Sequence, residues 1–215
     1  MKTNNDYLVV SQLWIQGQFI RRRPDLIVFV NGLPLIFIEL KNSNIALRNA
    51  YDDNLLNYRK DIPLLFHYNA ICILSNGLET KVGSFNSGYE HFFHWLRAEN
   101  ENQVPDKKRI KQYGVSLDYA VLGLCEKQRF LDYVENFILY YNDIAKIAAK
   151  NHQFLGVNNA ISNFSLRLEH DAAGTDTGNK GKLGVFWHTQ GSGKSYSMIF
   201  FARKVFRKFT GNYTF

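Results

Sequence analysis

Apolar residues near the start of the chain follow the spacings of β-strands. The unbroken apolar run from Leu26 to Val30 is typical of a strand covered on both faces. Asn31-Gly32 follows it as a strong turn signal, and Leu35 to Lys41 then predicts a second strand. Ala70 to Ser75 predicts a third core strand, and residues 80 to 83 a short fourth one.

Between the second and third of these strands the spacing becomes helical. A helix is expected from Ser43, which caps its start, to about Lys60. Its inner face carries residues three and four apart, namely Leu47, Tyr51, Asn54 and Tyr58. The order strand, strand, helix, strand predicts a small mixed β-sheet with a helix against it, in the α/β class.

The later part of the chain has a mainly helical pattern. Polar and charged residues from 99 to 112 predict a linker or exposed loop. Residues 121 to about 164 are predicted to be helical, with a second helix starting near Asn142. Residues 171 to 182 are rich in Gly, Thr and Asp and predict a mobile loop.

Composition narrows the class of protein. The 215 residues are 46% hydrophobic and 15% aromatic, which argues against disorder and allows one good-sized core or two small ones. The formal charge of +7 favours a polyanionic partner such as nucleic acid. Cys72 and Cys125 lie in apolar stretches, which favours buried free thiols over a disulfide. We expect a cytoplasmic location without membrane contact, because the chain shows neither a signal-peptide core nor an apolar run of ~20 residues.

Charged residues interrupt the second apolar strand. Alternation places Glu39 and Lys41 on one face of it, where charges are costly unless they pair or serve a site. Register decides whether Asp25 joins them. A strict two-residue turn sets Asp25 opposite Ile38, whereas a three-residue loop, a bulge or a bend at Pro24 sets it opposite Glu39. We predict one of the latter three.

Asp25, Glu39 and Lys41 together suit phosphate chemistry. Two adjacent carboxylates repel each other, and a hard divalent cation such as Mg²⁺ removes that conflict. The ion activates water and offsets charge on phosphate, while Lys41 orients the water or stabilises the same charge. On spacing alone, a surface ion pair between Glu39 and Lys41 on an edge strand is the competing interpretation.

A resemblance supports the nuclease interpretation. Pro24-Asp25 followed by Glu39-Leu40-Lys41 resembles the PD-(D/E)xK nuclease motif. The wider strings from Arg22 to Leu35 and from Ile38 to Asn42 are similar to the motor (restriction) subunit of type I restriction-modification enzymes. The resemblance implies metal ligation by Asp25 and Glu39 and Mg²⁺-dependent cleavage of double-stranded DNA.

The same resemblance implies roles for two residues on the following helix, and three arginines are further candidates. Asn54 and Tyr58 match the family's Gln-x-x-x-Tyr element on the following helix, with Asn in place of Gln and a side chain one methylene shorter. Packing and helix surface are the alternative roles for both. Arg21, Arg22 and Arg23 lie beside Asp25 and are predicted to hold the DNA backbone, the alternative being a solvated basic turn.

A second phosphate site is predicted near the end of the chain. Residues 184 to 187 are expected to form a short buried strand that enters a Gly-rich loop, and residues 195 to about 208 a helix. Glycines let backbone N–H groups face phosphates, and the helix N-terminus adds partial positive charge. Lys194 would contact the outer phosphates and Ser195 would coordinate Mg²⁺. The predicted nucleotide-binding residues are Thr189, Gln190, Gly191, Ser192, Gly193, Lys194 and Ser195.

The strict phosphate-loop pattern has Gly or Ala where this chain has His188. With residues 187 to 190 before it, Gly-Ser-Gly-Lys-Ser instead resembles the first motif of superfamily 2 helicase-like motors. Gln153 is similar to the adenine-reading glutamine of such motors, with a helix-surface role as the alternative. Residues 1–115 are therefore predicted to be the nuclease domain, and residues 116–215 a helical connector and the start of a RecA-like motor domain.

Three functions remain open. The leading one is part of a type I restriction motor subunit, which implies ATP-driven DNA translocation and partnership with modification and specificity subunits. Family members usually have nuclease sequence ahead of the first strand and further ATPase motifs after Ser195, so the N-terminal part of the domain is expected to be missing and ATP hydrolysis by this chain alone is not expected. The second is an inactive DNA-binding or assembly piece. The third, a phosphate-loop kinase or unrelated ATPase, leaves the Asp25 constellation unexplained.

Overall fold

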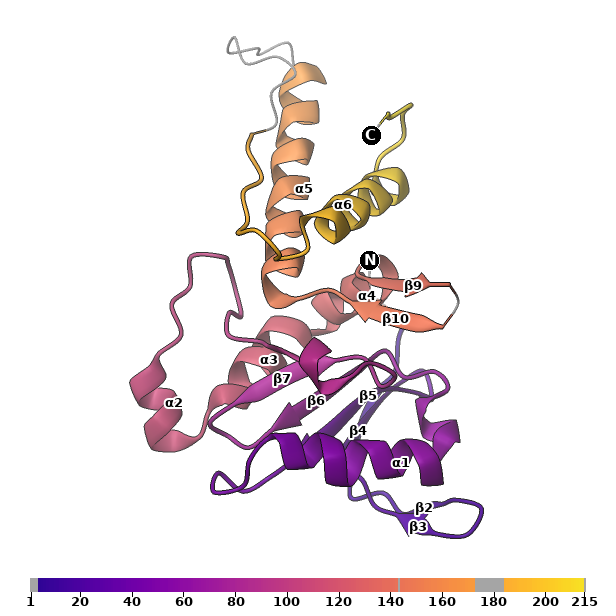
Figure 1. Ribbon diagram of the computed structural model, residues 1–215. Helices are drawn as coiled ribbons and strands as arrows, with labels where there is room; N and C mark the ends of the chain where they lie inside the picture. The colour runs from indigo at the N-terminus through magenta and orange to yellow at the C-terminus, as the bar shows by residue number, and fades with distance from the viewer. Residues whose placement is uncertain (1–3, 143, 173–183, 215) are drawn as a thin grey trace.

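A six-stranded mixed β-sheet forms the base of the molecule. The computed structural model describes residues 4–142, 144–172 and 184–214 (Figure 1). The strand order is β1-β4-β5-β6-β7-β8, with β5 and β6 parallel and the other neighbours antiparallel. The predicted mixed sheet is therefore confirmed. Its strands are β1 (Tyr7–Ser11), β4 (Leu26–Val30), β5 (Leu33–Leu40), β6 (Ile71–Ser75), β7 (Thr80–Gly83) and β8 (Phe93–His94).

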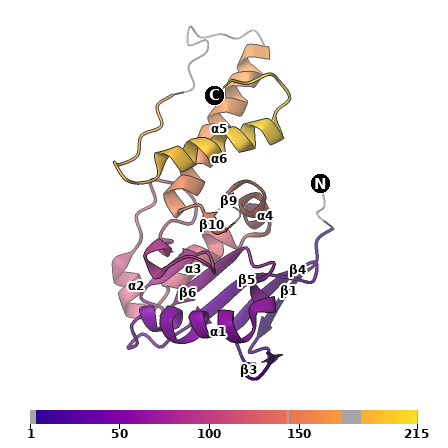
Figure 2. The same cartoon turned by 45° about the vertical axis from the view of Figure 1, so that its right-hand side comes forward.

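Both faces of the central strands are covered, as the unbroken apolar runs predict. One face, with Ile27 and Phe37, packs against the π-helical segment η1 (Ala50–Leu55), α1 (Leu56–Asp61) and the 3-10 turn η2 (Pro63–Phe66). The other face, with Ile36 and Ile73, belongs to a core that continues into the later helices, the first two of which lie beside the sheet while the last two extend away from it in Figures 1 and 2. These helices are α3 (Ser116–Leu124), α4 (Lys127–Asn136), α5 (Asn151–Ala172) and α6 (Lys194–Lys208).

The β4–β5 hairpin contains both a two-residue turn and a bulge. Asn31 and Gly32 have φ of 51° and 80°, the left-handed pair that a type I′ turn requires. Val28 pairs with Ile36 while Phe29 pairs with Pro34, so Leu35 is the extra residue of a β-bulge. Of the routes predicted to align Asp25 with Glu39, the structure uses the bulge.

The helix after β5 begins later than predicted. Residues 43 to 47 form turns, in which the Asn42 side-chain oxygen accepts from the Asn44 backbone N–H at 3.0 Å. An Asn side chain offers the backbone this local alternative to helix, and the first helical segment, η1, starts at Ala50. Leu47, Tyr51 and Tyr58 are buried, which confirms the predicted inner face for these three residues.

The predicted linker at 99–112 is partly helical. Residues 107 to 113 form α2 (Lys107–Tyr113). The Asp106 side chain caps its start by accepting from the Arg109 N–H at 2.9 Å, and Gly114 ends it with φ of 65°. Both are standard helix boundary signals, and they override the polar composition. The helix Ser116–Leu124 then begins earlier than the predicted residue 121.

The predicted helical region from 121 to about 164 is helical in α3, α4 and α5, but the second helix predicted to start near Asn142 is wrong. The antiparallel strands β9 (Ile138–Tyr141) and β10 (Ala145–Ala148) separate α4 from α5. Asn142 has φ of 50° and lies in the turn between them. Aromatic and β-branched residues here suit a strand, and pairing with β10 outweighs the helical spacing.

The predicted buried strand at 184–187 is also wrong. Residues 184 to 187 are extended but pair with no strand of the described residues, and the side chains of Val185 and Trp187 are 93% and 76% exposed. An apolar segment becomes a strand only where a neighbour supplies hydrogen bonds. The helix predicted from 195 to 208 is confirmed as α6. Of the predicted loop at 171–182, residues 171 and 172 belong to α5 and the rest lie outside the described residues.

Small elements complete the fold. A two-stranded ribbon of β2 (Ile15–Gln16) and β3 (Arg21–Arg22) projects from the sheet past the end of α1 (Figure 1, lower right), and η3 (Tyr89–His91) precedes β8. Cys72 and Cys125 are free thiols, as predicted. No helix of the described residues has the length and apolarity needed to cross a membrane. The predicted division of the chain into two domains at residue 115 stays a prediction. One apolar core contains residues from both sides of that point, from Val30 and Ile36 to Phe200 in α6.

The turn that sets the β4–β5 register gives a stability prediction. Gly32→Val should lower the free energy of unfolding by about 1–2 kcal/mol, because a β-branched residue is strained at φ of 80°. Among the described residues no atom lies within 4 Å of a Cβ built at Gly32, so the substitution introduces backbone strain without a clash there. Urea unfolding measures the loss. Gly32→Asn is the control, since Asn tolerates this conformation, and equal losses for the two variants would contradict the assigned turn.

Candidate active site

The β-bulge brings Asp25 beside the end of β5. The ladder pairs Leu26 with Ile38, and one further step along it places Asp25 opposite Glu39. The Leu40 N–H donates to the Asp25 carboxylate at 2.8 Å, and the Gln12 N–H donates to the Asp25 carbonyl at 2.8 Å. Asp25 is thus held at both its backbone and its side chain, on the face of the sheet that α1 covers.

Glu39 and Lys41 do not form a surface pair on an edge strand. Strand β5 lies between β4 and β6, and Glu39 is only 2% exposed. The Lys41 ammonium lies 3.5 Å from one Glu39 carboxylate oxygen. The other oxygen, Oε2, is buried without a hydrogen-bond partner among the residues that the structure describes. A buried carboxylate oxygen left in this state is costly and indicates a missing ligand.

The electrostatics of Glu39 point the same way. Burial of its carboxyl, with the negative charge of Asp25 beside it, raises the pKa of Glu39 from 4.5 to about 7, although Lys41 opposes the shift. A cation held by the two carboxylates would offset both causes of the shift by stabilising the charged form of Glu39.

The residues present fit a hard divalent ion bound by few protein ligands. No group of three or more His, Cys, Asp or Glu side chains suited to a metal occurs in the described part of the chain. Asp25 and Glu39 would supply two carboxylates. This number suits Mg²⁺, which keeps several waters and binds one or two carboxylates together with phosphate oxygens.

Tyr58 closes one side of this site from α1. Its ring packs edge-on against Phe37, with centroids 5.9 Å apart. Burial raises the pKa of the Tyr58 hydroxyl, the hydrogen bond from Asn54 opposes that shift, and the negative charges of Glu39 and Asp25 add to it. The Asn54 amide donates to the Tyr58 hydroxyl at 3.3 Å, and that hydroxyl donates to the Arg23 carbonyl at 3.4 Å. Asn54 thus reaches the site through Tyr58.

The three arginines before Asp25 have different surroundings. Arg22 is paired with Asp61 at 2.5 Å and lies 5.8 Å from the Tyr58 ring centroid. Arg21 and Arg23 are exposed, and the Arg23 guanidinium stacks 5.0 Å from the ring centroid of Trp14. Sequence reasoning missed Asp61 and Trp14. Trp14 lies at two-residue spacing from Gln16, which signals the outer face of a strand, whereas nothing local signals Asp61.

Two glycines of the Gly-rich loop have left-handed backbone conformations. Gly191 and Gly193 have φ of 76° and 88°, and Gly193 caps the start of α6 without a side-chain hydrogen bond. The Lys194 ammonium donates to the backbone carbonyls of His188 and Thr189, at 3.0 and 3.4 Å. Its charge therefore lies over the loop formed by Thr189, Gln190, Gly191, Ser192 and Gly193, with Ser195 in the first turn of the helix.

Gln153 lies behind the loop and not on the surface of a helix. It is 2% exposed, and its amide donates to the Gly193 carbonyl at 2.9 Å while its oxygen accepts from the Lys150 N–H at 2.8 Å. The neighbouring His152 ring contacts the Ser192 carbonyl at 3.1 Å. The helix-surface alternative for Gln153 is therefore wrong. The observed contacts are to the loop backbone.

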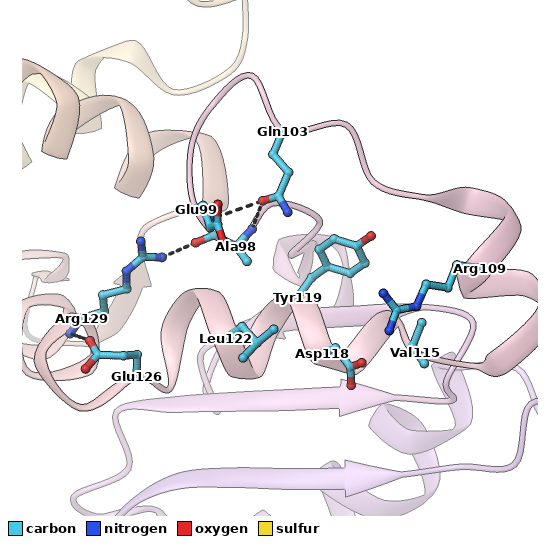
Figure 3. Close-up of a pocket in the computed structure, with 10 residues that line it drawn as sticks. All are labelled: Ala98, Glu99, Gln103, Arg109, Val115, Asp118, Tyr119, Leu122, Glu126 and Arg129. Atoms are coloured by element: carbon cyan, nitrogen blue, oxygen red, sulfur yellow. Dashed lines mark hydrogen bonds between the residues drawn. The ribbon is translucent and has the colours of Figure 1, made fainter.

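A cavity of about 440 Å³ lies elsewhere, between α2, α3 and the loop after Trp95 (Figure 3). Arg109, Tyr119 and Leu122 line it, and Gln103 turns inward to accept from the N–H groups of Ala98 and Glu99. None of the predicted site residues lines this cavity.

Comparison with protein families divides the chain into two matched segments. Residues 2–91 match the model of the type I restriction enzyme R protein N terminus. Residues 152–215 match that of the SWI2/SNF2 ATPase. The first segment contains Asp25, Glu39, Lys41 and Tyr58, and the second contains Gln153 and the Gly-rich loop.

Several curated proteins are similar over nearly the whole chain. A putative type I restriction enzyme MjaIXP endonuclease subunit from Methanocaldococcus jannaschii is 34% identical over 97% of this chain and 21% of its own length. The type I restriction enzyme HindI endonuclease subunit from Haemophilus influenzae is 37% identical over 94% of this chain and 19% of its own. The chain thus spans about a fifth of the length of the curated relatives it matches.

The raised pKa of Glu39 gives a pH prediction in metal-free buffer. Between pH 4.5 and about 7 the unfolded chain loses this proton while the folded chain keeps it, so stability falls as pH rises through that window. Glu39→Gln removes the effect and should be more stable than the parent at pH 8, by about 3 kcal/mol at most, with the gap closing towards pH 4.5.

Urea unfolding across this pH range, with EDTA present, measures the gap. Glu79→Gln, which removes an exposed acid from the turn between β6 and β7, should keep the pH dependence of the parent. A Glu39→Gln variant whose stability tracks that of the parent at every pH would show that the carboxyl is not held as described.

Proposed function

This chain belongs to the type I restriction enzyme R protein family, and on that premise we propose that Asp25, Glu39 and Lys41 form a Mg²⁺-dependent site that cleaves double-stranded DNA. The observation that carries the proposal is the buried Glu39 oxygen without a partner among the described residues, next to Asp25 and Lys41. A structural ion pair would satisfy both carboxylate oxygens. A site that receives a cation and a phosphodiester leaves one free.

Each residue has a distinct role in the proposed reaction. The carboxylates of Asp25 and Glu39 hold the ion, which when bound supplies Lewis acidity towards the scissile phosphate. The Lys41 ammonium, 3.5 Å from Glu39, orients the attacking water or donates to the phosphate as negative charge develops. Tyr58 fixes the backbone just before Asp25 through the Arg23 carbonyl, with Asn54 holding its hydroxyl.

We propose that the Gly-rich loop binds ATP with Mg²⁺. The positive φ values of Gly191 and Gly193 curve the loop ahead of α6, whose N-terminus adds partial positive charge. When ATP binds, the Lys194 ammonium would contact phosphate oxygens in place of the two loop carbonyls, and the Ser195 hydroxyl would coordinate Mg²⁺. Gln153 holds the loop through Gly193 in addition to any contact with adenine.

In the whole protein, the proposal extends to ATP-driven movement along DNA in the cytoplasm and to assembly with modification and specificity subunits. This extension rests on the family, whose curated relatives are named as type I restriction endonuclease subunits. A second candidate is a DNA-binding or assembly piece without cleavage. It is favoured by Asn54, whose amide contacts Tyr58 and whose side chain is shorter than the family's glutamine.

Nicking of supercoiled plasmid separates the two candidates. With Mg²⁺ the parent chain should convert supercoiled to open-circular DNA, and Lys41→Ala should slow this by about 10²-fold or more, because the variant lacks the group that stabilises developing charge. EDTA should stop the reaction. Lys60→Ala removes the same charge from the exposed surface of α1 and should nick like the parent. Equal nicking by the parent and Lys41→Ala would leave the non-cleaving piece as the function.

Thermal unfolding with Mg²⁺ and ATP tests the loop. A ligand at about 100 times its Kd stabilises the folded state by about 2.7 kcal/mol, so the Tm of the parent should rise. Lys194→Ala should lose that rise because the ammonium that meets the phosphates is gone. Lys208→Ala, at the far end of α6, should keep it. A rise of the same size in Lys194→Ala would contradict the proposed site.

A further inference from the structure

The β2–β3 ribbon presents a surface of unusual composition next to the proposed nuclease site. The strands pair Ile15 with Arg22 and Gln16 with Arg21. Residues 14 to 23 contain three arginines and no acid. Alternation turns Leu13 and Ile15 towards the core under α1 and turns the intervening side chains outward. We call this exposed set the outer face of the ribbon, and it consists of Trp14, Gln16, Phe19, Arg21 and Arg23.

Two large aromatic side chains on this face are exposed to solvent. Trp14 is 61% exposed, and Phe19, in the loop between the strands, is 86% exposed. The Arg23 guanidinium lies over the Trp14 ring at 5.0 Å, and Arg21 donates to the Gln16 side-chain oxygen at 2.9 Å. Aromatic rings interleaved with guanidinium groups are the composition that meets bases and phosphates together.

The ribbon is held firmly in place. Arg22, on its inner side, pairs with Asp61 at the end of α1, at 2.5 Å. Gly17 lies so close to α1 that an added Cβ would stand 2.0 Å from the Asp61 carbonyl oxygen. The Gly17 N–H donates to the Ile20 carbonyl at 3.0 Å, which closes the loop at the ribbon's tip. These contacts tie the ribbon to α1, whose Tyr58 donates to the Arg23 carbonyl two residues before Asp25.

The outer face is also close to the carboxylates in sequence and in space. Arg23 is two residues before Asp25, and its carbonyl accepts from Tyr58 at 3.4 Å. The ribbon projects from the sheet past the end of α1 (Figure 1), and Arg22 at the end of β3 lies three residues before Asp25 in the chain, so this face is near any duplex whose phosphate reaches Asp25. Duplex DNA carries one negative charge per about 1.7 Å of its axis, which complements Arg21 and Arg23.

We infer that the outer face of the β2–β3 ribbon docks into a groove of duplex DNA beside the scissile phosphate, with Phe19 entering the groove and Arg21 and Arg23 contacting the backbone. This inference rests on the proposed nuclease function and adds to it the element that places the duplex. A two-stranded ribbon has the width that the major groove admits, where an apolar side chain can contact thymine methyl groups.

Fluorescence anisotropy with a labelled duplex, in EDTA so that the DNA stays intact, tests the inference across a series of salt concentrations. Phe19→Ala should weaken binding about tenfold, equal to about 1.4 kcal/mol, without changing the salt dependence. Arg21→Ala combined with Arg23→Ala should reduce the slope of log affinity against log salt by about two, because two phosphates are no longer neutralised by the protein.

Leu64→Ala is the matched control. Leu64 lies in η2 and is 83% exposed, so its truncation removes an equally exposed apolar side chain away from the ribbon, and the variant should bind like the parent. If both ribbon variants bind with the affinity and salt slope of the parent, the inference is overturned. The proposed function would still stand in that case, provided that the parent nicks plasmid. A parent chain that neither nicks plasmid nor binds the duplex would overturn both.

Discussion

The position of the Asp25 carboxylate against the buried Glu39 carboxylate is the constraint on which the rest of the site depends. One extra residue in β5, Leu35, shifts the hairpin register and turns Asp25 to the face that holds Glu39. The bulge is supported on its other side, where the Ala70 N–H donates to the Leu35 carbonyl at 2.7 Å. A regular hairpin would set Asp25 opposite Ile38 and leave the two carboxylates on opposite faces of the sheet.

That arrangement costs stability, and the surrounding core supports it. Two acids and one amine lie at the ends of strands whose neighbouring side chains, such as Phe37 and Leu74, are buried. Charge in such a place is unfavourable unless an ion and a substrate complete it. The pKa of Glu39 is raised as a result. Tyr58 of α1 covers this side of the site and keeps out water that would otherwise stabilise the charged carboxylate. Sites of this kind trade stability for a prepared electrostatic environment.

The helix α6, which follows the Gly-rich loop, is held against the rest of the fold by packing and by paired charges. The Lys204 ammonium in α6 contacts both Asp132 carboxylate oxygens in α4, at 2.5 and 2.6 Å, and the Asn158 side-chain oxygen in α5. Arg203 donates to the Ile138 carbonyl at the start of β9. The helix that leads from the loop is thereby fixed against the elements that cover the far face of the sheet. A shift of α6 on nucleotide binding would have to move α4 with it or break these contacts.

The central strands, α6, the buried residues of η1 and α1 and the residue types of the two candidate sites follow from the sequence alone, because apolar periodicity and glycine placement act locally. Capping by Asp106 and Gly114 also lies in the sequence, although the polar composition around them hides it. Tertiary structure decided the rest. Pairing with a neighbour makes residues 138–148 a hairpin and leaves residues 184–187 unpaired among the described strands. The choice among a longer loop, a bend and a bulge, which aligns Asp25 with Glu39, was likewise settled by strand pairing. The contact of Arg22 with Asp61 joins residues 39 positions apart, and no local pattern encodes such a distance. Spacing specifies which side chains share a face, but which faces meet depends on the free energy of the whole packed chain.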